Sequence, residues 1–363
     1  MKEEGRKLTL KVLHISSAIT WRGGENQIRL LLNGLKGKCD NILFCPFESP
    51  LSQRIRNDVA QVIQFRKTAG ISISLSFKIK KLCDNQKINI VHVHDSHAHN
   101  YAVGAALLGS KSSIIVTRRV DFIPSWISLY KYNHNSVKKV VSVSENIYNV
   151  LRKRGVDKRR LTTIYSAIDL AQKDKRKDLK KILNIEPQRK VIGFVGALVK
   201  HKDPITFIKM VHLLINEKCN YHFILVGNHG EYSEEVKKYI QKFRLGENIS
   251  YLGFVVNMEE VWSTLDVLVI TSKMEGLGSV ALEAFNSKTA VVSTDAGGLI
   301  EIIKHNKNGL VSPVGDELSL KNNVKKILGD DALKSKLVNQ GFEDVKNFGH
   351  LGLAKTYLSL YHK

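Results

Sequence analysis

Two carboxylates flank a glycine-rich turn in the segment MEGLGSVALEA. Glu275 stands before Gly276 and Gly278, and Glu283 follows eight positions later, in a stretch beginning at Ser279 that suits a helix. Such a helix start exposes unpaired amides and the positive dipole end, which attract a pyrophosphate. Glutamates on either side can bind hydroxyl groups. The segment predicts a site for a nucleoside diphosphate sugar; an ordinary helix start with dipole-compensating acids is the alternative.

Three further glycine turns in the second half follow strand-like runs. In GALVKHKDP, Gly196 allows close approach of a ligand and Lys202 can reach an anion. VGNHGE places Gly227 at another strand end, and DAGGLIEII supplies a glycine pair ahead of a helix. As a lone lysine, Lys202 would be unremarkable, because Lys200 and His201 stand beside it.

The first half carries cations at its strand ends. In WRGGENQ, Arg22 precedes the pair Gly23 and Gly24, which predicts a tight turn into a helix that a phosphate or sugar can approach. In TRRVDF, Arg118 and Arg119 suit phosphate, because a guanidinium grips it through two parallel hydrogen bonds. A turn without any ligand is the alternative for the glycine pair, and an exposed pair that binds nothing is the alternative for the arginines.

Four histidines in HVHDSHAHN raise the question of a metal. His92 and His94 share one face of a strand, whereas His97 and His99 fall in a loop or helix start and need not converge. We expect no metal site. Satisfied histidines at a strand end, or one that touches the substrate, are the preferred interpretation.

Short apolar runs alternate with amphipathic helical segments along the whole chain. Such strands, apolar on both faces, are typical of parallel sheets covered by helices, and the βαβα order predicts a doubly wound α/β fold. The expected strands are 10–16, 41–46, 89–94, 114–118, 140–144, 161–165, 190–198, 221–228, 248–254, 266–272, 290–296 and 309–313.

The order of these runs predicts two similar domains with one cleft between them. We expect an N-terminal acceptor domain over 1–168 and a nucleotide-sugar domain over 169–345. A charged run at 173–183 is interpreted as the linker, and a C-terminal helix over 346–363 is expected to pack back on the first domain. Ligands of such sheets bind beyond the carboxyl ends of the strands.

Composition indicates a globular protein with a basic first half. The 363 residues are 43% hydrophobic, with a formal net charge of +22. Residues 1–168 hold 28 Lys+Arg and 11 Asp+Glu, a net of +17, against 28 and 23, a net of +5, in 169–363. No apolar run approaches the length of a membrane span, the N-terminus lacks a signal-peptide layout, and the four cysteines form no CxxC pair, which favours a reducing cytoplasm.

Together these motifs resemble the family 4 retaining glycosyltransferases, which have the GT-B fold of two Rossmann-like domains facing a cleft. EGLGSVALEA resembles the E-x7-E motif of that family, WRGGENQ its N-terminal glycine loop and GALVKHKDP its phosphate-binding strand end. The run DAGGLIEIIKHNKNGLVSPVGD matches the motifs that follow. The likeness extends over nearly the whole chain, and the four motifs occur in the family's order.

The resemblance implies that Glu275 binds hydroxyls of the donor sugar, that Glu283 binds the nucleotide ribose and that Lys202 neutralises the diphosphate. The roles given to Arg118 and Arg119 are inferred from their residue type and place, not from the resemblance. Glu275, Lys202 and Arg119 are the expected catalytic residues, and Arg22, His94, Arg118 and Arg119 are expected to bind the acceptor. The expected donor site comprises Gly23, Gly24, Gly196, Lys202, Gly227, Glu275, Gly276, Leu277, Gly278, Ser279 and Glu283.

One position departs from the family. Ala197 stands where an arginine is usual, and we expect Arg118 or Arg119 to supply the missing cation. The chain holds no D-x-D motif, which favours GT-B and a reaction without an obligatory metal or cofactor.

The expected reaction transfers a hexose or N-acetylhexosamine from a nucleoside diphosphate sugar, with UDP favoured over GDP, to a hydroxyl. The +17 charge of residues 1–168 favours an anionic, membrane-associated glycan or lipid acceptor and a peripheral enzyme on the cytoplasmic face of the membrane. No nucleic-acid partner is expected. A nucleotide-sugar epimerase and a non-catalytic polyanion-binding protein are the alternatives.

Overall fold

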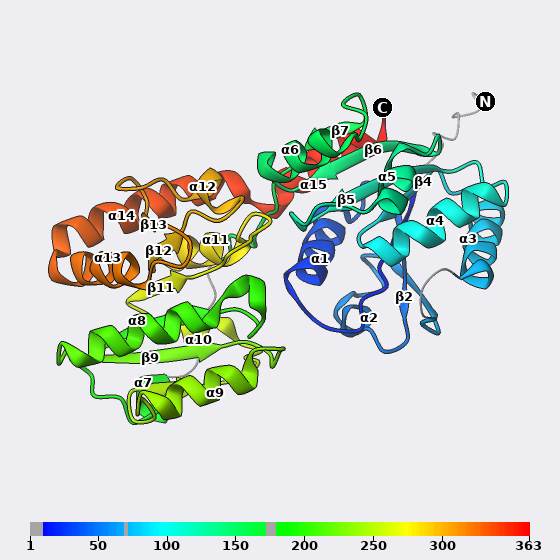
Figure 1. The fold of residues 1–363 in the computed structure, drawn as a ribbon. Helices are drawn as coiled ribbons and strands as arrows, with labels where there is room; N and C mark the ends of the chain where they lie inside the picture. Colours follow the sequence, from blue (N-terminus) through cyan, green and yellow to red (C-terminus); the bar gives the residue numbers. More distant parts are fainter. Residues whose placement is uncertain (1–9, 69–71, 172–178) are drawn as a thin grey trace. The chain divides into compact units, whose positions relative to one another are not determined.

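The computed structural model describes residues 10–68, 72–171 and 179–363, which form two compact units (Figure 1). Unit 1 comprises Met1–Asp169 and Phe348–Lys363, and unit 2 comprises Leu170–Asn347. Most of the charged run interpreted as a linker, 173–178, lies outside the described residues, as do residues 1–9. Each unit holds a parallel sheet covered by helices, so the predicted doubly wound α/β fold is confirmed.

The sheet of unit 1 has the strand order β3-β2-β1-β4-β5-β6-β7. Strands β2 and β3 are added on one side of β1 and the later strands on the other side, so the order of addition reverses between β1 and β4. Its strands are β1 (Lys11–Ile15), β2 (Asp40–Pro46), β3 (Gln61–Phe65), β4 (Ile90–Val93), β5 (Ser113–Arg118), β6 (Val137–Ser142) and β7 (Leu161–Thr163). Its helices are α1 (Gly23–Leu35), α2 (Pro50–Arg54), α3 (Ile73–Gln86), α4 (Ser96–Leu107), α5 (Trp126–Asn133), α6 (Glu145–Arg154) and α15 (His350–Tyr361).

The sheet of unit 2 has the order β10-β9-β8-β11-β12-β13 and reverses between β8 and β11. Its strands are β8 (Lys190–Val195), β9 (Tyr221–Val226), β10 (Ile249–Tyr251), β11 (Val267–Ile270), β12 (Ala290–Thr294) and β13 (Leu310–Ser312). The helices are α7 (Leu179–Ile182), η1 (Lys200–Lys202), α8 (Pro204–Asn216), α9 (Ser233–Lys242), α10 (Met258–Trp262), α11 (Ser279–Asn286), α12 (Leu299–Ile302), α13 (Glu317–Gly329), α14 (Asp331–Asp344) and, at the return to unit 1, η2 (Val345–Phe348).

One strand was missed and one begins well before its predicted start, while several others are shorter than predicted, such as β10 at Ile249–Tyr251 against 248–254. The edge strand β3 was not predicted, because its residues QVIQF are mostly half-exposed and its apolar run is short. The strand β6 begins at Val137 rather than at 140, because the lysines of VKKV reach solvent while their backbone stays in the sheet.

Each sheet packs its helices through a continuous apolar core. In unit 1, α1 and α15 cover one face, where Leu31 and Tyr357 meet Val12, Ile115 and their neighbours. The two helices approach closely at Gly34, since a methyl group there would lie 2.6 Å from Cβ of Ala354. In unit 2, α8 and α13 cover the equivalent core.

Within the described residues, none of the helices combines the length and the hydrophobicity that crossing a bilayer requires.

Candidate active site

The chain segments after β8 and β11 meet where the strand order of unit 2 reverses. Lys202, in η1 after β8, forms an ion pair with Glu275, which follows β11. The two side chains are only 24% and 12% exposed, and the Oγ of Ser272 donates a second hydrogen bond to the same carboxylate at 3.1 Å. The fold thus brings together two predicted site residues 73 positions apart, at the place where open α/β sheets bind ligands.

Backbone contacts fix these two segments against each other. The amide of Lys273 donates to the carbonyl of His201 at 2.8 Å, and the hydroxyl of Thr271 donates to the carbonyl of Asp203 at 2.8 Å. The buried carboxylate of Asp203 caps α8 and pairs with Lys273 at 3.1 Å. The ion pair of Lys202 and Glu275 is therefore held on a rigid frame.

Glycines bring the backbone of neighbouring loops into direct contact. Gly227 has φ +150°, and a methyl group there would lie 1.9 Å from the carbonyl oxygen of Gly196. A methyl group on Gly298 would lie 2.2 Å from the carbonyl oxygen of Gly276, and the amide of Gly298 donates to the carbonyl of Glu275 at 2.9 Å. The strand ends of unit 2 are therefore lined by bare main chain.

The predicted helix after the glycine turn is α11, which begins at Ser279. Gly278 precedes it with φ +91°, a left-handed conformation that favours glycine. Glu283 lies about one turn into α11 and is half-buried. Leu277 is only 3% exposed, so its side chain is not available to a ligand.

A second set of predicted residues meets at the reversal point of unit 1, between β1 and β4. The guanidinium of Arg119 donates to the carbonyl of His94 at 3.2 Å and to its Nδ1 at 3.3 Å. Gly24 lies beside them, since a methyl group there would be 3.8 Å from Cδ of Arg119. Ser17 and Asp95, which follow the same two strands, are joined by two hydrogen bonds of 2.6 Å.

The remaining predicted residues of unit 1 lie apart from this group. Arg118 turns towards α5, where it donates to the hydroxyl of Tyr132 at 2.9 Å. Arg22 and Gly23 are exposed at the start of α1, where the amide of Arg22 donates to Glu25 at 2.9 Å. The two arginines of TRRVDF therefore do not act on one ligand group together.

A chain of hydrogen bonds runs behind Arg119. Because an arginine can only donate, Nδ1 of His94 accepts, and its Nε2 donates to Nδ1 of His14 at 3.1 Å. Nε2 of His14 then donates to Oδ1 of Asn41 at 3.3 Å. Burial lowers the pKa of His14 to about 3 and, with the nearby charges of His92 and Arg119, holds the pKa of His94 well below its usual value. Both rings are therefore neutral, and each carries its proton on Nε2.

The nitrogens of His14, His92 and His94 lie within 4.8 Å of one another, close enough to hold a metal ion. All six ring nitrogens already have hydrogen-bond partners, those of His92 being Tyr361 at 2.6 Å and Thr117 at 2.7 Å. The guanidinium of Arg119 also contacts the cluster. We interpret the three rings as a hydrogen-bond network that positions Arg119.

Sequence reasoning missed His14, which lies 80 positions before His94. Only the pairing register of β1 and β4 could have revealed it, because parallel pairing places His14 opposite His92. His97 is exposed on α4, and His99 packs against Tyr132 with ring centroids 5.1 Å apart, so neither joins the cluster.

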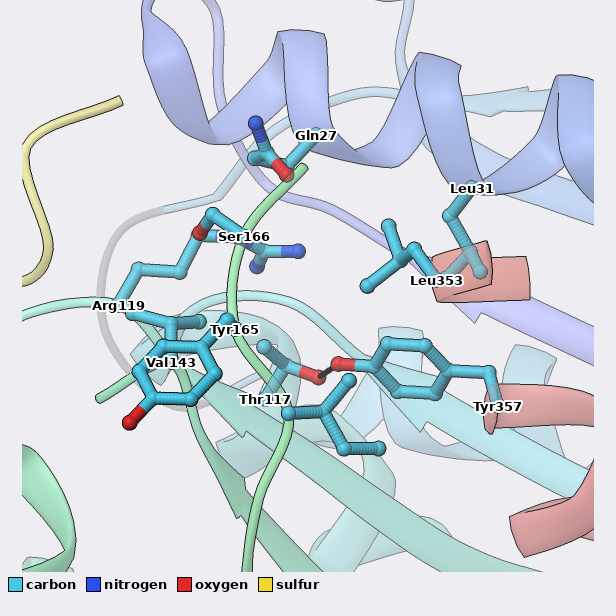
Figure 2. Close-up of a pocket in the computed structure, with 10 residues that line it drawn as sticks. Gln27, Leu31, Thr117, Arg119, Val143, Tyr165, Ser166, Leu353 and Tyr357 are labelled. Carbon is cyan, nitrogen blue, oxygen red and sulfur yellow. Dashed lines mark hydrogen bonds between the residues drawn. The ribbon is translucent and has the colours of Figure 1, made fainter. Parts of the chain in front are cut away.

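Arg119 also lines a small pocket in unit 1 (Figure 2). Gln27, Thr117, Ser166 and Tyr357 share this pocket, and Thr117 and Tyr357 are joined by a hydrogen bond of 2.8 Å. Gln27, which sequence reasoning did not select, holds the backbone of Ala167 through two hydrogen bonds of 2.7 and 2.9 Å. The Nε of Arg119 is buried there without a hydrogen-bond partner among the described residues.

Both halves of the chain match models of known families. Residues 21–172 match the model described as Glycosyltransferase Family 4, and residues 175–344 match the model described as Glycosyl transferases group 1. The N-acetyl-alpha-D-glucosaminyl L-malate synthase of Bacillus anthracis is 22% identical over 301 residues, which are 80% of this chain and 78% of that protein.

A relative from Campylobacter jejuni, N-acetylgalactosamine-N,N'-diacetylbacillosaminyl-diphospho-undecaprenol 4-alpha-N-acetylgalactosaminyltransferase, is 25% identical over 299 residues, 78% of this chain and 79% of that protein. Among solved structures, Anabaena HepE in complex with UDP and glucose superposes with a TM-score of 0.87 at 16% identity, covering 98% of this chain and all of that one. The likeness to HepE shows the GT-B fold. Since the two family models together account for most of the chain, this protein belongs to the glycosyltransferases of group 1 and family 4 and is a transferase enzyme.

Proposed function

We propose that this enzyme moves a sugar from a nucleoside diphosphate sugar to a hydroxyl of a membrane-associated glycan or lipid, with retention of the anomeric configuration. The observation that carries the proposal is the largely buried ion pair of Lys202 and Glu275 beside glycine-lined strand ends. The start of α11 has no side-chain cap, so its first amides can stabilise a diphosphate.

The ion pair gives each partner a role in the proposed reaction. When the donor binds, Lys202 exchanges its carboxylate partner for the diphosphate, and Glu275 turns to the hydroxyls of the sugar. The acceptor hydroxyl attacks from the face of the leaving group, and a phosphate oxygen takes its proton. Lys202 and the amides stabilise the departing diphosphate, and Arg119 in unit 1 orients the acceptor.

Two similar proteins support the proposed donor and acceptor. HepE is solved with UDP and glucose, which favours a UDP-sugar, and the relative from Campylobacter jejuni is named for a diphospho-undecaprenol acceptor. The proposed acceptor is accordingly an anionic, lipid-linked glycan of the cell envelope, reached from the cytoplasmic side of the membrane. No cofactor or metal is required in this scheme.

A panel of UDP- and GDP-sugars scored by thermal shift tests the donor. Binding to the folded state raises the melting temperature, with about 2.7 kcal/mol of stabilisation at a concentration of a hundred times Kd. We expect one UDP-sugar to give the largest shift and Glu275→Gln to reduce it. A new epimer formed from the donor alone would identify an epimerase instead, and salt-sensitive RNA binding without any donor turnover would identify a polyanion-binding protein.

A further inference from the structure

The loop and helix that follow β5 display apolar side chains on the surface of unit 1. Asp121 is the single charged residue in the run from 120 to 130. Ile123, Trp126 and Ile127 are 76%, 72% and 72% exposed. The full set, called the α5 surface below, is Val120, Phe122, Ile123, Trp126, Ile127 and Tyr130.

Arginines hold the backbone of this loop in place. Arg118 donates to the carbonyl of Phe122, and Nε of Arg154 donates to the carbonyl of Pro124 at 3.0 Å. The hydroxyl of Ser125 caps α5, while Lys131 and Tyr132 are buried. The apolar side chains are thus presented by an anchored segment and not by a frayed loop. Contiguous exposed patches of this kind mark interaction sites.

A basic segment lies against the α5 surface. Residues 152–160, RKRGVDKRR, contain six Lys+Arg and one acid, a net of +5. The guanidinium of Arg154 stacks 4.4 Å above the ring of Trp126, so the apolar and basic parts are in contact. Asp157 forms hydrogen bonds of 2.8 to 3.1 Å with Arg159, which neutralises the one acid locally.

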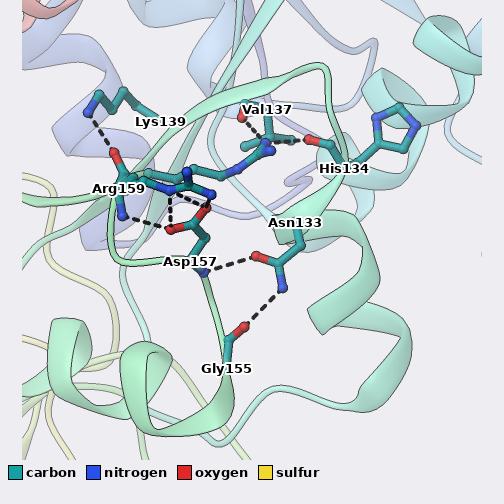
Figure 3. A network of polar contacts seen from close by, with 8 residues as sticks. Asn133, His134, Val137, Lys139, Gly155, Asp157 and Arg159 are labelled. Carbon is teal, nitrogen blue, oxygen red and sulfur yellow. Dashed lines mark hydrogen bonds and ion pairs between the residues drawn. The ribbon is translucent and has the colours of Figure 1, made fainter.

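Asn133, at the end of α5, fastens the two segments together (Figure 3). Its Nδ2 donates to the carbonyl of Gly155, and its Oδ1 accepts from the amide of Asp157, both at 3.0 Å. Arg160 adds a hydrogen bond of 2.6 Å to the carbonyl of His134. The exposed aromatic residues and the cations therefore form one fixed surface.

We propose that the α5 surface and segment 152–160 dock unit 1 on an anionic lipid bilayer. Trp, Tyr and Phe favour the depth of the headgroups, and each Lys or Arg near an anionic surface adds about 1 kcal/mol of attraction that salt weakens. A bilayer satisfies both parts at once, because the apolar side chains enter the headgroup region while the net charge of +5 on residues 152–160 faces anionic lipid. The benefit of docking rests on the proposed function, since a lipid-linked acceptor lies in that membrane.

Co-sedimentation with phosphatidylcholine vesicles, with and without one-third phosphatidylglycerol, tests the proposal in the absence of any nucleotide. We expect the full-length protein to sediment only with the anionic vesicles. The double variant Trp126→Ser, Ile127→Ser should partition at least about tenfold more weakly. The double variant Arg152→Gln, Lys153→Gln should partition about 30-fold more weakly, mostly at low salt.

Two control variants remove the same kinds of side chain at other places on the protein, which tests whether the position of the removed groups matters. Ile73→Ser with Phe77→Ser removes exposed apolar groups from α3, and Lys326→Gln with Lys336→Gln removes the same charge from unit 2. Both should bind as the wild type does, and all four double variants should keep their melting temperature and donor-induced thermal shift.

Three results would overturn the proposal: vesicle binding unchanged in the Trp126 variant, equal loss in the controls, or self-association through the α5 surface, seen by sedimentation velocity, with no vesicle binding. Because vesicle binding is measured without donor, its failure leaves the sugar-transfer proposal standing with a soluble acceptor. An absent donor shift, in turn, leaves the docking result intact.

Discussion

Units 1 and 2 have similar topologies, but the loops at their strand ends contact one another differently, through main chain in unit 2 and through side chains in unit 1. In unit 2 the loops beyond β8 and β11 touch through bare main chain, with Gly227 against Gly196 and Gly298 against Gly276. In unit 1 the ends of β1 and β4 are joined by side chains, through Ser17 to Asp95 and through the buried histidines.

The difference follows from what each unit is proposed to bind. A diphosphate is recognised by main-chain amides, and glycine lets neighbouring loops pack closely enough to present them. An acceptor that varies between glycans is recognised by side chains, whose positions must be fixed by partners of their own.

Glu275→Gln should reduce kcat/KM for sugar transfer about 10²- to 10³-fold, because the neutral amide neither pairs with Lys202 nor grips the donor sugar as a carboxylate does. Steady-state kinetics with the donor found by thermal shift provides the measurement. Glu234→Gln, an exposed acid on α9, is the control and should leave activity unchanged. If Glu275→Gln keeps activity within threefold of the wild type, the ion pair of Lys202 and Glu275 is not part of the active site.

Gly227→Ala should destabilise the protein by about 2–4 kcal/mol, because a methyl group 1.9 Å from the carbonyl oxygen of Gly196 forces backbone of unit 2 apart. Urea unfolding followed by circular dichroism gives the free energy of unfolding. Gly298→Ala, with its contact of 2.2 Å, should behave alike. A loss below about 1 kcal/mol in both would mean that these loops yield easily and that close main-chain packing does not distinguish unit 2.

Arg119→Lys should lower kcat/KM about 10- to 100-fold while leaving the donor-induced thermal shift unchanged. Lysine keeps the charge but cannot span the carbonyl and Nδ1 of His94 as the guanidinium does, so the cation loses its position. Paired kinetic and thermal-shift measurements on one preparation separate the two effects. If the variant loses the donor-induced thermal shift, Arg119 contributes to donor binding and not to acceptor binding.

Acid should destabilise unit 1 before unit 2. Among the described residues, buried histidines with lowered pKa are His14, His92, His94 and His99 in unit 1 and His222 in unit 2. Since burial lowers their pKa in the folded state, the unfolded chain takes up protons first as pH falls below about 6.5. Stability is therefore fully present above that pH and declines towards pH 3, by about 2 kcal/mol for each fully neutral ring at pH 5.

His99 provides the cleanest test of this pH dependence. Its pKa is lowered to about 3 by burial and by the charge of Lys131, and its ring packs on Tyr132. In His99→Phe, the difference in free energy of unfolding between pH 7.5 and pH 5 should shrink by about 2 kcal/mol. An unchanged difference would show that His99 takes up a proton in the folded state without penalty.

Gly24→Ala should change the free energy of unfolding by no more than about 0.5 kcal/mol, because its methyl group would meet only Cδ of Arg119 at 3.8 Å. This is the counterpart of Gly227→Ala in the other unit. Reduced transfer in a variant of normal stability would indicate that a ligand approaches the glycine turn after β1. A large loss of stability would instead show that unit 1, like unit 2, depends on bare main chain.

Much of the fold followed from local patterns, and the exceptions are instructive. Runs such as DVLVITS, apolar at every position, indicate a strand covered on both faces. The edge strand β3 escaped because only Phe65 in it is buried, so its apolar signal is weak. The start of β6 escaped because hydropathy counts Lys138 and Lys139 as breaks, although their alkyl chains allow the backbone to remain in the sheet.

The candidate site was predicted in part. Glycines and charged residues at strand ends could be selected one motif at a time, since their types are unusual at those places. The contact partners of these residues could not be predicted, because no local pattern indicates which distant residue completes an ion pair. Glu275, 73 positions after Lys202, is such a partner. His14 and Gln27 were missed for the same reason: each is ordinary in its own element and gains meaning only from residues distant in the chain, His92 and His94 for His14 and Ala167 for Gln27.

The sequence by itself determined the alternation of strands and helices, the glycine turns and the excess charge of the first half, because each depends on residues close together in the chain. Tertiary structure alone decided that Arg118 and Arg119 diverge, that three histidines form a neutral network behind Arg119, and that segment 152–160 lies on the aromatic residues of α5. Those arrangements depend on sheet register and helix packing, which are set by the free energy of the whole folded unit and not by any short stretch of it.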